Sequence, residues 1–266
     1  MASPTSSALA RRPVAFAALA GSCLIGIAFA QDAVRSWDVH STDRPQPPVV
    51  TPGTPGTTTQ PGTPPSDAIV LIGPGTGLDA WDHQRWTVED GGVVQVKPGT
   101  GDNKTKASFG DCQVHLEWMI PEDRECNGQA GCNSGIFFVD GRYEVQILGS
   151  NANETYPDGQ AGSLYGQYPP LANPCRPNGQ WNVFDIMFTA PRFDGDTLVA
   201  PATTTVIFNG VVVQDHVEFM GITAHGSRAK YAPHPSTGFI KLQDHGDPIK
   251  FANMWVRPLP DRAPAW

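Results

Sequence analysis

Short apolar runs recur along the chain, separated by Gly, Pro, Asn or Asp, and no stretch of a dozen residues shows a helical period. This pattern predicts strands at Ala68–Leu71, Trp86–Glu89, Val93–Val96, Cys112–Met119, Gly135–Val139, Tyr143–Leu148, Trp181–Thr189, Thr203–Phe208, Val211–Val217, Gly238–Gln243 and Ile249–Val256. Asn209-Gly210 lies between two β-branched runs and predicts a tight hairpin, because both residues tolerate positive φ. We therefore expect an all-β fold, an antiparallel sandwich of two curved sheets.

Three of these stretches alternate a polar row with an apolar row. The polar rows are Gln113, His115 and Glu117; then Glu144 and Gln146; then Lys241, Gln243 and His245. A solvated outer face would explain any one row. Glu, Gln and His beside aromatic rings are instead typical of a pocket for neutral polyhydroxylated ligands, so the rows predict a concave binding face.

Loop residues add to this predicted binding face. Asn133 and Asn182 offer amides that can bind hydroxyl groups, and Gln146 and Gln243 offer amides from the strands. Tyr165 and Trp181 lie in Gly/Pro-rich surroundings and are the candidates for stacking on a sugar ring.

Composition narrows the classes of function. The 266 residues include 28 Gly and 26 Pro, which argues against a helical bundle. The formal net charge is −8, with 18 Lys and Arg, so the surface repels phosphate backbones and nucleic acid is excluded as a partner. Neutral ligands such as sugars fit this charge balance.

The first thirty residues resemble a secretory signal. Arg11 and Arg12 precede an apolar stretch, and Ala28-Phe29-Ala30 supplies the small-x-small pattern cut by signal peptidase. This pattern predicts cleavage before Gln31. The chain that remains would have a net charge of −10. An uncleaved membrane anchor is the alternative. We expect export, with no stable membrane insertion after cleavage.

The rest of the chain divides by composition. Residues 31–66 contain a run of Pro, Thr, Gly, Val and Gln too poor in apolar groups to fold, which predicts a disordered linker. Residues 67–260 form the predicted folded domain, long enough for one substantial core, and residues 261–266 are a short tail.

Four cysteines lie beyond the signal: Cys112, Cys126, Cys132 and Cys175. An even number in an exported chain predicts two disulfides, of three possible connectivities. Cys126 and Cys132 flank a short loop and could close it, which would leave Cys112 with Cys175. A metal site is the alternative, although the spacings match no zinc pattern.

Six motifs in register carry a family resemblance over roughly Ile69–Pro258. They are Phe109-Gly110-Asp111-Cys112, His115-Leu116-Glu117-Trp118, Gly131-Cys132-Asn133-Ser134-Gly135-Ile136-Phe137, Tyr143-Glu144-Val145-Gln146-Ile147, Trp181-Asn182-Val183-Phe184-Asp185 and Leu242-Gln243-Asp244-His245-Gly246. In this order they resemble the 3-keto-disaccharide hydrolase domain family. The chain departs from the family at Met119, where members often carry Arg, and at Gly149-Ser150, where many have Asp-Ser.

The resemblance implies a concanavalin A-like jelly-roll sandwich, exported by a bacterium to the periplasm, the cell surface or the medium. It also implies an enzyme that cleaves glycosides whose glucose C3 is a ketone, by elimination or with net hydrolysis. Removal of the C2 proton needs one base and one acid. Glu144 or His245 could be the base and the other the acid, with Glu117 a further carboxylate expected in the same cleft.

Two other functions fit parts of the sequence. A conventional glycosidase needs two carboxylates beside the bond, for which Glu117 and Glu144 are candidates, since the residue two after Glu144 is the amide Gln146. A lectin-like module that only binds glycans would suit a tethered sandwich domain. The sequence requires no cofactor, leaves room for a divalent metal, and leaves the oligomeric state open.

Overall fold

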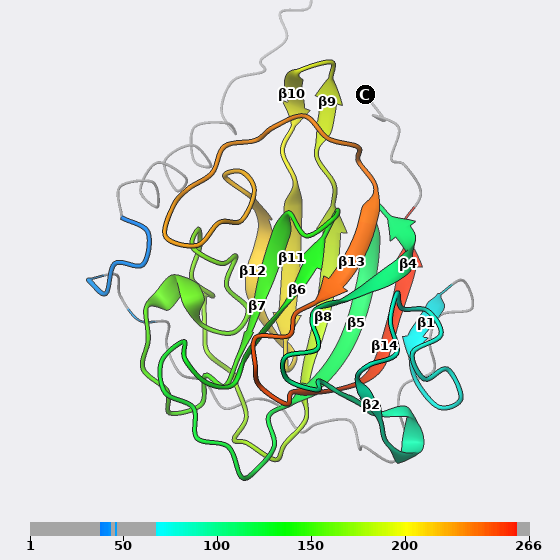
Figure 1. Ribbon diagram of the computed structural model, residues 1–266. Helices are drawn as coiled ribbons and strands as arrows, with labels where there is room; N and C mark the ends of the chain where they lie inside the picture. Colours follow the sequence, from blue (N-terminus) through cyan, green and yellow to red (C-terminus); the bar gives the residue numbers. More distant parts are fainter. Residues whose placement is uncertain (1–37, 44–45, 47–67, 260–266) are drawn as a thin grey trace, which may run out of the picture. The chain divides into compact units, whose positions relative to one another are not determined.

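Two antiparallel sheets pack face to face in the computed structural model, which describes residues 38–43, 46 and 68–259 (Figure 1). The predicted signal and tail, and most of the predicted linker, lie outside the described residues. The all-β sandwich expected from the sequence is confirmed. The helical residues of the described part form two short 3-10 turns, η1 (Asp90–Gly92) and η2 (Pro157–Gly159).

The larger sheet has eight strands in the order β12-β11-β8-β5-β14-β3-β2, with β1 also paired to β14. In chain order these strands are β1 (Ile69–Ile72), β2 (Thr87–Val88), β3 (Val94–Gln95), β5 (Cys112–Met119), β8 (Asn182–Thr189), β11 (Thr203–Phe208), β12 (Val211–Glu218) and β14 (Lys250–Pro258). Its centre, β8-β5-β14, joins strands far apart in the sequence, as is typical of a jelly roll.

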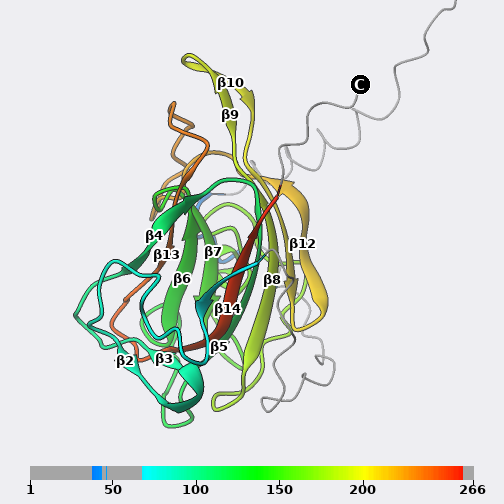
Figure 2. The same cartoon turned by 90° about the vertical axis from the view of Figure 1, so that its right-hand side faces the viewer.

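The smaller sheet has four strands in the order β4-β13-β6-β7. They are β4 (Asn103–Phe109), β6 (Asn133–Phe138), β7 (Tyr143–Leu148) and β13 (Gly238–Leu242). Viewed along the sheets, this layer lies beside the layer that contains β14, β5 and β8 (Figure 2). A separate hairpin of β9 (Arg192–Asp194) and β10 (Thr197–Ala200) projects beyond one end of the sandwich (Figure 2).

Alternate residues of both sheets fill the core. Along β5, burial alternates strictly, with Leu116 and Trp118 fully buried between the sheets. Phe138 of β6 stacks on Phe188 of β8 with ring centroids 4.4 Å apart, so the two layers are in direct contact. Because Phe138 points inward, the neighbouring Phe137 points to the outer face of the smaller sheet.

Strands β6 and β7 differ from β5 because every residue along them is buried. One face packs into the core and loops cover much of the other. The outer edge of β7 is also protected: Gln146 exchanges backbone hydrogen bonds with residues 162 and 163, at 2.9 and 3.0 Å. A partly covered outer face of this kind can hold a pocket, whereas a bare sheet cannot.

Each predicted strand overlaps an observed one, and Asn209-Gly210 forms the expected β11–β12 hairpin with φ values of 50° and 81°. Three observed strands, β4, β9 and β10, were not predicted, and β4 matters most because it completes the smaller sheet. Its sequence, NKTKASF, has no apolar run, since several of its side chains face solvent at the sheet edge. No helix in the described part of the chain is long and apolar enough to span a membrane.

Candidate functional site

The outer face of the smaller sheet brings polar residues of three strands into register. Phe137 of β6 lies opposite Glu144 of β7 on one side and Lys241 of β13 on the other. One step along the sheet, Gly135 lies between Gln146 and Gln243. Directly paired residues project to the same face, so the predicted polar rows of β7 and β13 meet here.

These rows form the floor of a pocket of about 270 Å³. Loops that follow β7 and β12 supply its walls. The lining residues are Asn133, Phe137, Glu144, Gln146, Tyr165, Thr223, Ala224, His225, Lys241, Gln243 and His245. Of these described residues, Glu144 is the only one that carries a carboxylate.

Glu144 lies deep in this floor and its side chain is 5% exposed. Its backbone N–H, at the sheet edge, donates to Thr223 Oγ1 at 3.0 Å, which ties the wall loop to β7. Burial raises the pKa of Glu144 to about 8; the nearby Asp102 charge also raises it, and the Lys241 charge lowers it. At neutral pH the group can therefore both hold and release a proton.

Gln146 lies next to Glu144 on the same face and is 1% exposed. Its Nε2 donates to Gln129 Oε1 at 3.0 Å, and the other end of its amide lies 3.0 Å from Glu144 Oε1. A hydrogen bond joins these two side chains when Glu144 carries a proton or when the amide is turned. Gln146 therefore responds directly to the protonation state of Glu144.

Lys241 brings a positive charge to the floor. Its Nζ lies 2.9 Å from Asp102 Oδ2 and 3.8 Å from the centroid of the Phe137 ring. The ion pair and the ring hold the ammonium group over the sheet. Lys241 shares its predicted polar row with Gln243 and His245, and that row is the sequence signal for its place in the site, although no role was predicted for it.

An aromatic wall lies on another side of the pocket. Tyr165 Oη hydrogen bonds to Tyr156 Oη at 2.8 Å and to His225 Nδ1 at 2.9 Å. Burial raises the pKa of both tyrosines, which keeps their hydroxyls protonated. His245 lines the pocket from the turn after β13 and is exposed to solvent. His225 and Thr223 were missed because their loop has no periodic pattern.

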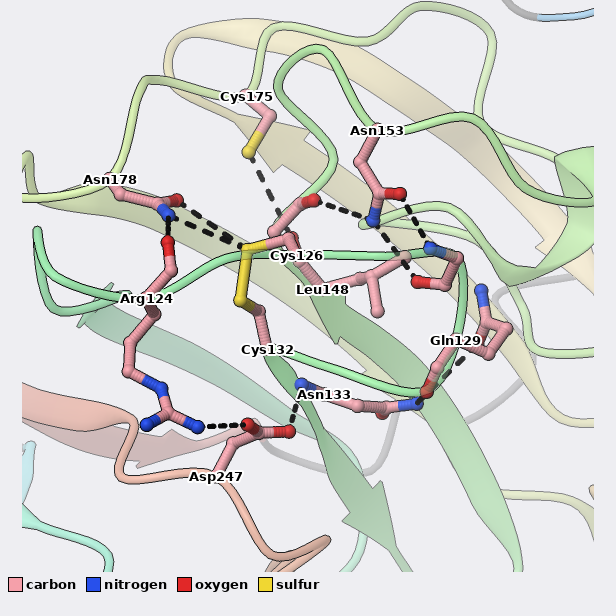
Figure 3. The surroundings of a disulfide bond; sticks show 12 residues. Arg124, Cys126, Gln129, Cys132, Asn133, Leu148, Asn153, Cys175, Asn178 and Asp247 are labelled. Atoms are coloured by element: carbon pink, nitrogen blue, oxygen red, sulfur yellow. Dashed lines mark hydrogen bonds and ion pairs between the residues drawn. A yellow bond between two sulfur atoms is a disulfide. The ribbon is translucent and has the colours of Figure 1, made fainter.

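The predicted disulfide between Cys126 and Cys132 forms, and Cys132 directly precedes Asn133, which lines the pocket (Figure 3). It packs against Gly149, just after β7, where a Cβ would collide with Cys126 Sγ, so the bridge requires glycine at this position. The closed loop carries Gln129, whose main-chain oxygen accepts from Asn133 Nδ2 at 3.0 Å. The bridge therefore holds in place the loop residue Gln129, which accepts hydrogen bonds from both Asn133 and Gln146 of the pocket.

The model of the 3-keto-alpha-glucoside-1,2-lyase-like domain matches residues 67–257. The chain belongs to this family. A curated 3-keto-disaccharide hydrolase of Bacteroides thetaiotaomicron is 23% identical over 243 aligned residues, covering 73% of this chain and 79% of that protein. The family is carbohydrate-active, so the substrate class of the chain is a carbohydrate.

Solved structures agree with this assignment. A protein described as a "putative glycosyl hydrolase" from Parabacteroides distasonis is 44% identical, with a TM-score of 0.71, over 82% of this chain and 94% of that one. A second protein of the same description and organism is 21% identical, with a TM-score of 0.54, and covers 72% of this chain and 99% of that one; it shows the shared fold.

One predicted member of the lyase-like domain's site lies elsewhere. Glu117 is on β5 in the larger sheet and points away from the core, because Leu116 and Trp118 point inward. The sandwich core therefore separates it from Glu144, and the expectation that both face one cleft is wrong. Alternation assigned the correct face within each strand but could not tell which sheet a strand joins.

The outer face of the larger sheet gives Glu117 a different set of partners. His115 Nδ1 lies 2.7 Å from Asp185 Oδ1, and its Nε2 lies 3.5 Å from Glu117 Oε1. Asn253 Nδ2 donates to Glu117 Oε1 at 2.9 Å. Hydrogen bonds to Asp185 and Glu117 outweigh burial and raise the pKa of His115 to about 9, while the pKa of Glu117 is lowered. His115, Glu117 and Asp185 therefore pair with one another in an ionic network on this face.

Two more predicted binding residues fall outside the pocket. Asn182 is buried at the start of β8, where its Oδ1 accepts from Arg176 N at 3.0 Å and from Asn209 Nδ2 at 2.9 Å. Its role is to hold two loops together. Trp181 precedes it, and its carbonyl accepts a hydrogen bond from Arg176 Nη1. Neither residue lines the pocket, because β8 belongs to the larger sheet.

The second predicted disulfide does not form. Cys112 and Cys175 are both buried free thiols. Cys112 lies on β5 in the core, whereas Cys175 Sγ lies near the carbonyls of Leu148 and Arg176 (Figure 3). Burial raises the pKa of both thiols, that of Cys175 to about 12, so each is held in its unreactive protonated form.

The sequence alone does not decide whether the chain binds a divalent metal. Within the part of the chain that the structure describes, no three His, Cys, Asp or Glu side chains are placed to hold a metal ion. Asn133, Gln146, Gln243, Tyr165, Glu144 and His245 do share the pocket, so six of the nine predicted catalytic and binding residues are brought together.

Proposed function

We propose that this chain cleaves 3-keto-glycosides in the pocket on the smaller sheet, by removing the proton at C2 and expelling the oxygen at C1. The substrate class is taken from the family and from the curated relative, which is a 3-keto-disaccharide hydrolase. The pocket, at about 270 Å³, is close to the lower end of ligand sites, about 300–1,000 Å³, and suits a single sugar ring with part of its aglycone.

The ketone at C3 makes this route chemically accessible. Loss of the C2 proton leaves its electron pair in an enolate whose charge is carried by the C3 oxygen. Re-formation of the ketone then moves a pair into a C1–C2 double bond and breaks the bond from C1 to the leaving oxygen, which takes up a proton. Addition of water across the double bond, with hydroxyl at C1 and hydrogen at C2, gives net hydrolysis.

Glu144 is the proposed base, and its placement is the observation that carries the proposal. It is the carboxylate of the pocket floor, its pKa is raised to about 8 by burial, and it lies at the centre of the polar row. A base with a pKa near the working pH gains driving force for proton removal while still being available in its ionised form.

Lys241, Gln146 and His245 complete the proposed chemistry. Lys241 supplies a positive charge on the pocket floor, which can stabilise an enolate. The amide of Gln146 orients the Glu144 carboxyl group. His245 lies at the exposed rim, where a leaving aglycone would depart, and is the proposed acid.

A two-carboxylate glycosidase is disfavoured by the same geometry. Its mechanism requires a pair of acids flanking the bond. Glu117 lies on the other sheet, and the residue two positions after Glu144 is an amide. The third hypothesis is a lectin-like module that binds a glycan without converting it. The experiment below distinguishes this module from both proposed kinds of enzyme.

The decisive measurement follows a 3-keto-glucoside by NMR in heavy water. Elimination and rehydration predict one deuterium at C2 of the keto-sugar product, and Glu144→Gln should abolish both turnover and incorporation. Cleavage with no deuterium at C2 would overturn the proposed route in favour of direct hydrolysis. Binding without conversion would leave the lectin-like function.

We also propose that the chain is exported by a bacterium after cleavage before Gln31, to the periplasm, cell surface or medium. The signal-like segment and the Cys126–Cys132 bridge support this, since disulfides persist in oxidising compartments. Mass spectrometry of protein recovered outside the cytoplasm should give the mass of a chain that begins at Gln31. Recovery in the cytoplasm with Met1 retained would contradict it.

A further inference from the structure

Residues 38–43 lie upstream of the Pro/Thr/Gly-rich run, yet one of them contacts the aromatic wall of the pocket. The His40 ring lies 4.2 Å from the Tyr156 ring, 5.4 Å from the Tyr165 ring and 5.2 Å from the His225 ring, measured between centroids. Its φ of 62° turns the chain back towards these loops. A segment assigned to a linker by composition thus reaches the candidate site.

Hydrogen bonds fix the orientation of this ring. The Gly226 backbone N–H donates to His40 Nε2 at 2.9 Å, so that nitrogen is the acceptor and the ring proton is on Nδ1. Nδ1 faces the buried Asp158 carboxylate, 3.8 Å from its Oδ1, and the His40 backbone N–H also points to this carboxylate. The ring nitrogen that keeps the proton is therefore the one that faces Asp158.

The wall loop is anchored at two points. At its start, the Thr223 N–H donates to the carbonyl of Arg142, just before β7, at 2.7 Å, and Thr223 Oγ1 accepts from Glu144 N of β7 at 3.0 Å. Three residues later, Gly226 bonds to His40. His225 lies between these anchors and bonds to Tyr165 in the pocket wall. A change at the second anchor therefore moves a residue that lines the pocket.

We infer that His40 is a positioning residue that holds Tyr165 and His225 as one wall of the substrate pocket. The inference rests on the proposed function for its kinetic part. His40 itself does not line the pocket but touches three rings of the wall and its loop. It also lies outside residues 67–257, which match the family domain, so the domain shared with the family does not include this part of the wall.

The test uses full-length chain with His40→Ala, His40→Gln and the control Thr42→Ala. Thr42 is exposed in the same segment. Loss of the Gly226 bond should speed hydrogen exchange of the Gly226 amide about tenfold in His40→Ala, and Thr42→Ala should leave it unchanged. His40→Gln keeps an acceptor at the same reach, so we expect the exchange rate to return to within about twofold of the parent.

Steady-state kinetics with a 3-keto-glucoside distinguish a displaced pocket wall from a general loss of folded enzyme. His40→Ala should raise KM about three- to tenfold and change kcat by less than about twofold, because the floor residues are untouched. Unchanged Gly226 exchange, or faster exchange with unchanged KM, would overturn the inference. A parent chain without turnover would defeat the proposed function alone, since the exchange comparison needs no substrate and still decides whether His40 holds the wall.

Discussion

Gly135 of β6 lies against the Glu144 carboxylate so closely that a Cβ at residue 135 would be 2.6 Å from Glu144 Oε1 and 2.8 Å from the Phe137 ring. The absence of a side chain at this position makes room for the carboxylate on the floor. Since no positive φ is involved, the requirement for glycine is steric and is tied to the site rather than to a turn.

Gly135→Ala should therefore displace the Glu144 carboxyl group. We expect kcat/KM to fall about 10²-fold, as for loss of a positioned acid–base group, with a destabilisation of about 1–3 kcal/mol from overpacking. Steady-state kinetics and a thermal unfolding curve on the same sample check this. Full activity in Gly135→Ala would show that Glu144 does not need its observed position.

Glu144→Gln and Glu117→Gln form a matched pair, because each replaces a carboxyl group on the outer face of a different sheet by an amide. The first should lower turnover at least about 10²-fold, and the second should leave it within about threefold. In the parent, the low-pH limb of kcat/KM should rise as pH increases towards about 8, since the ionised base is the active form. Loss of activity in Glu117→Gln with retention in Glu144→Gln would reverse the assignment.

The same carboxyl group has an opposite effect on stability. A folded-state pKa raised above the unfolded value means that ionisation favours unfolding, so Glu144 destabilises the fold increasingly as pH rises from about 4.5 to about 8. Glu144→Gln should therefore unfold at a higher temperature than the parent at pH 9, and at nearly the same temperature at pH 4. A lower Tm for the variant at pH 9 would contradict the raised pKa.

Lys241→Met and Lys104→Met test the role of the ammonium group in the floor. The two lysines are directly paired on adjacent strands, but Lys104 does not line the pocket. Because Lys241 lowers the pKa of Glu144, its removal should shift the low-pH limb of kcat/KM to higher pH and lower the maximum kcat/KM at least about tenfold. An unchanged pH profile in Lys241→Met would show that the two groups are not coupled.

The sequence predicted the strands of the sandwich and most of the pocket floor, for a physical reason. Alternation of polar and apolar residues fixes which face of a strand a side chain joins, so Glu144 and Gln146 were placed correctly on β7, and Gln243 and His245 line the same pocket just beyond the end of β13. It does not fix strand order. Glu117 has the same pattern as Glu144 but lies on the other sheet, because its strand pairs with β8 and β14.

Contacts between distant loops were also beyond the sequence. His225 and His40 are separated by 185 positions and have no pattern that links them, yet their rings are neighbours. The cysteines show the same limit: the close pair Cys126–Cys132 could be predicted from spacing, whereas pairing of Cys112 with Cys175 was inferred by elimination and is wrong. An even count says nothing about whether two buried thiols meet.

The two free thiols give a direct test of the cysteine assignment. In native protein, Cys112 and Cys175 should react slowly with a thiol reagent, because both are buried and their pKa values are raised. Denaturation without reductant should expose both, in addition to Cys23 where the signal-like segment is retained. Absence of reaction at Cys112 and Cys175 in the denatured chain, read by mass spectrometry of peptides, would restore the second disulfide.

The raised pKa of His115, which lies on the larger sheet, predicts how the free energy of unfolding depends on pH. Its folded pKa of about 9 lies above the unfolded value, so its bonds to Asp185 and Glu117 stabilise the fold fully below about pH 6.5 and lose this effect as pH rises through about 9. The loss should be on the order of 3 kcal/mol. Denaturant unfolding at pH 6.5 and 9.5 measures it, and His115→Gln should show a smaller decline over this range.

The control for this measurement is His83→Gln, since the His83 ring hydrogen bonds to the backbone carbonyl of Asp102 rather than to a carboxylate. That variant should keep the pH dependence of the parent. Turnover of the 3-keto-glucoside should also survive in His115→Gln, because the sandwich core separates His115 from the pocket. A parallel decline in the parent and in His115→Gln would show that the ionic network is not the source of the pH dependence.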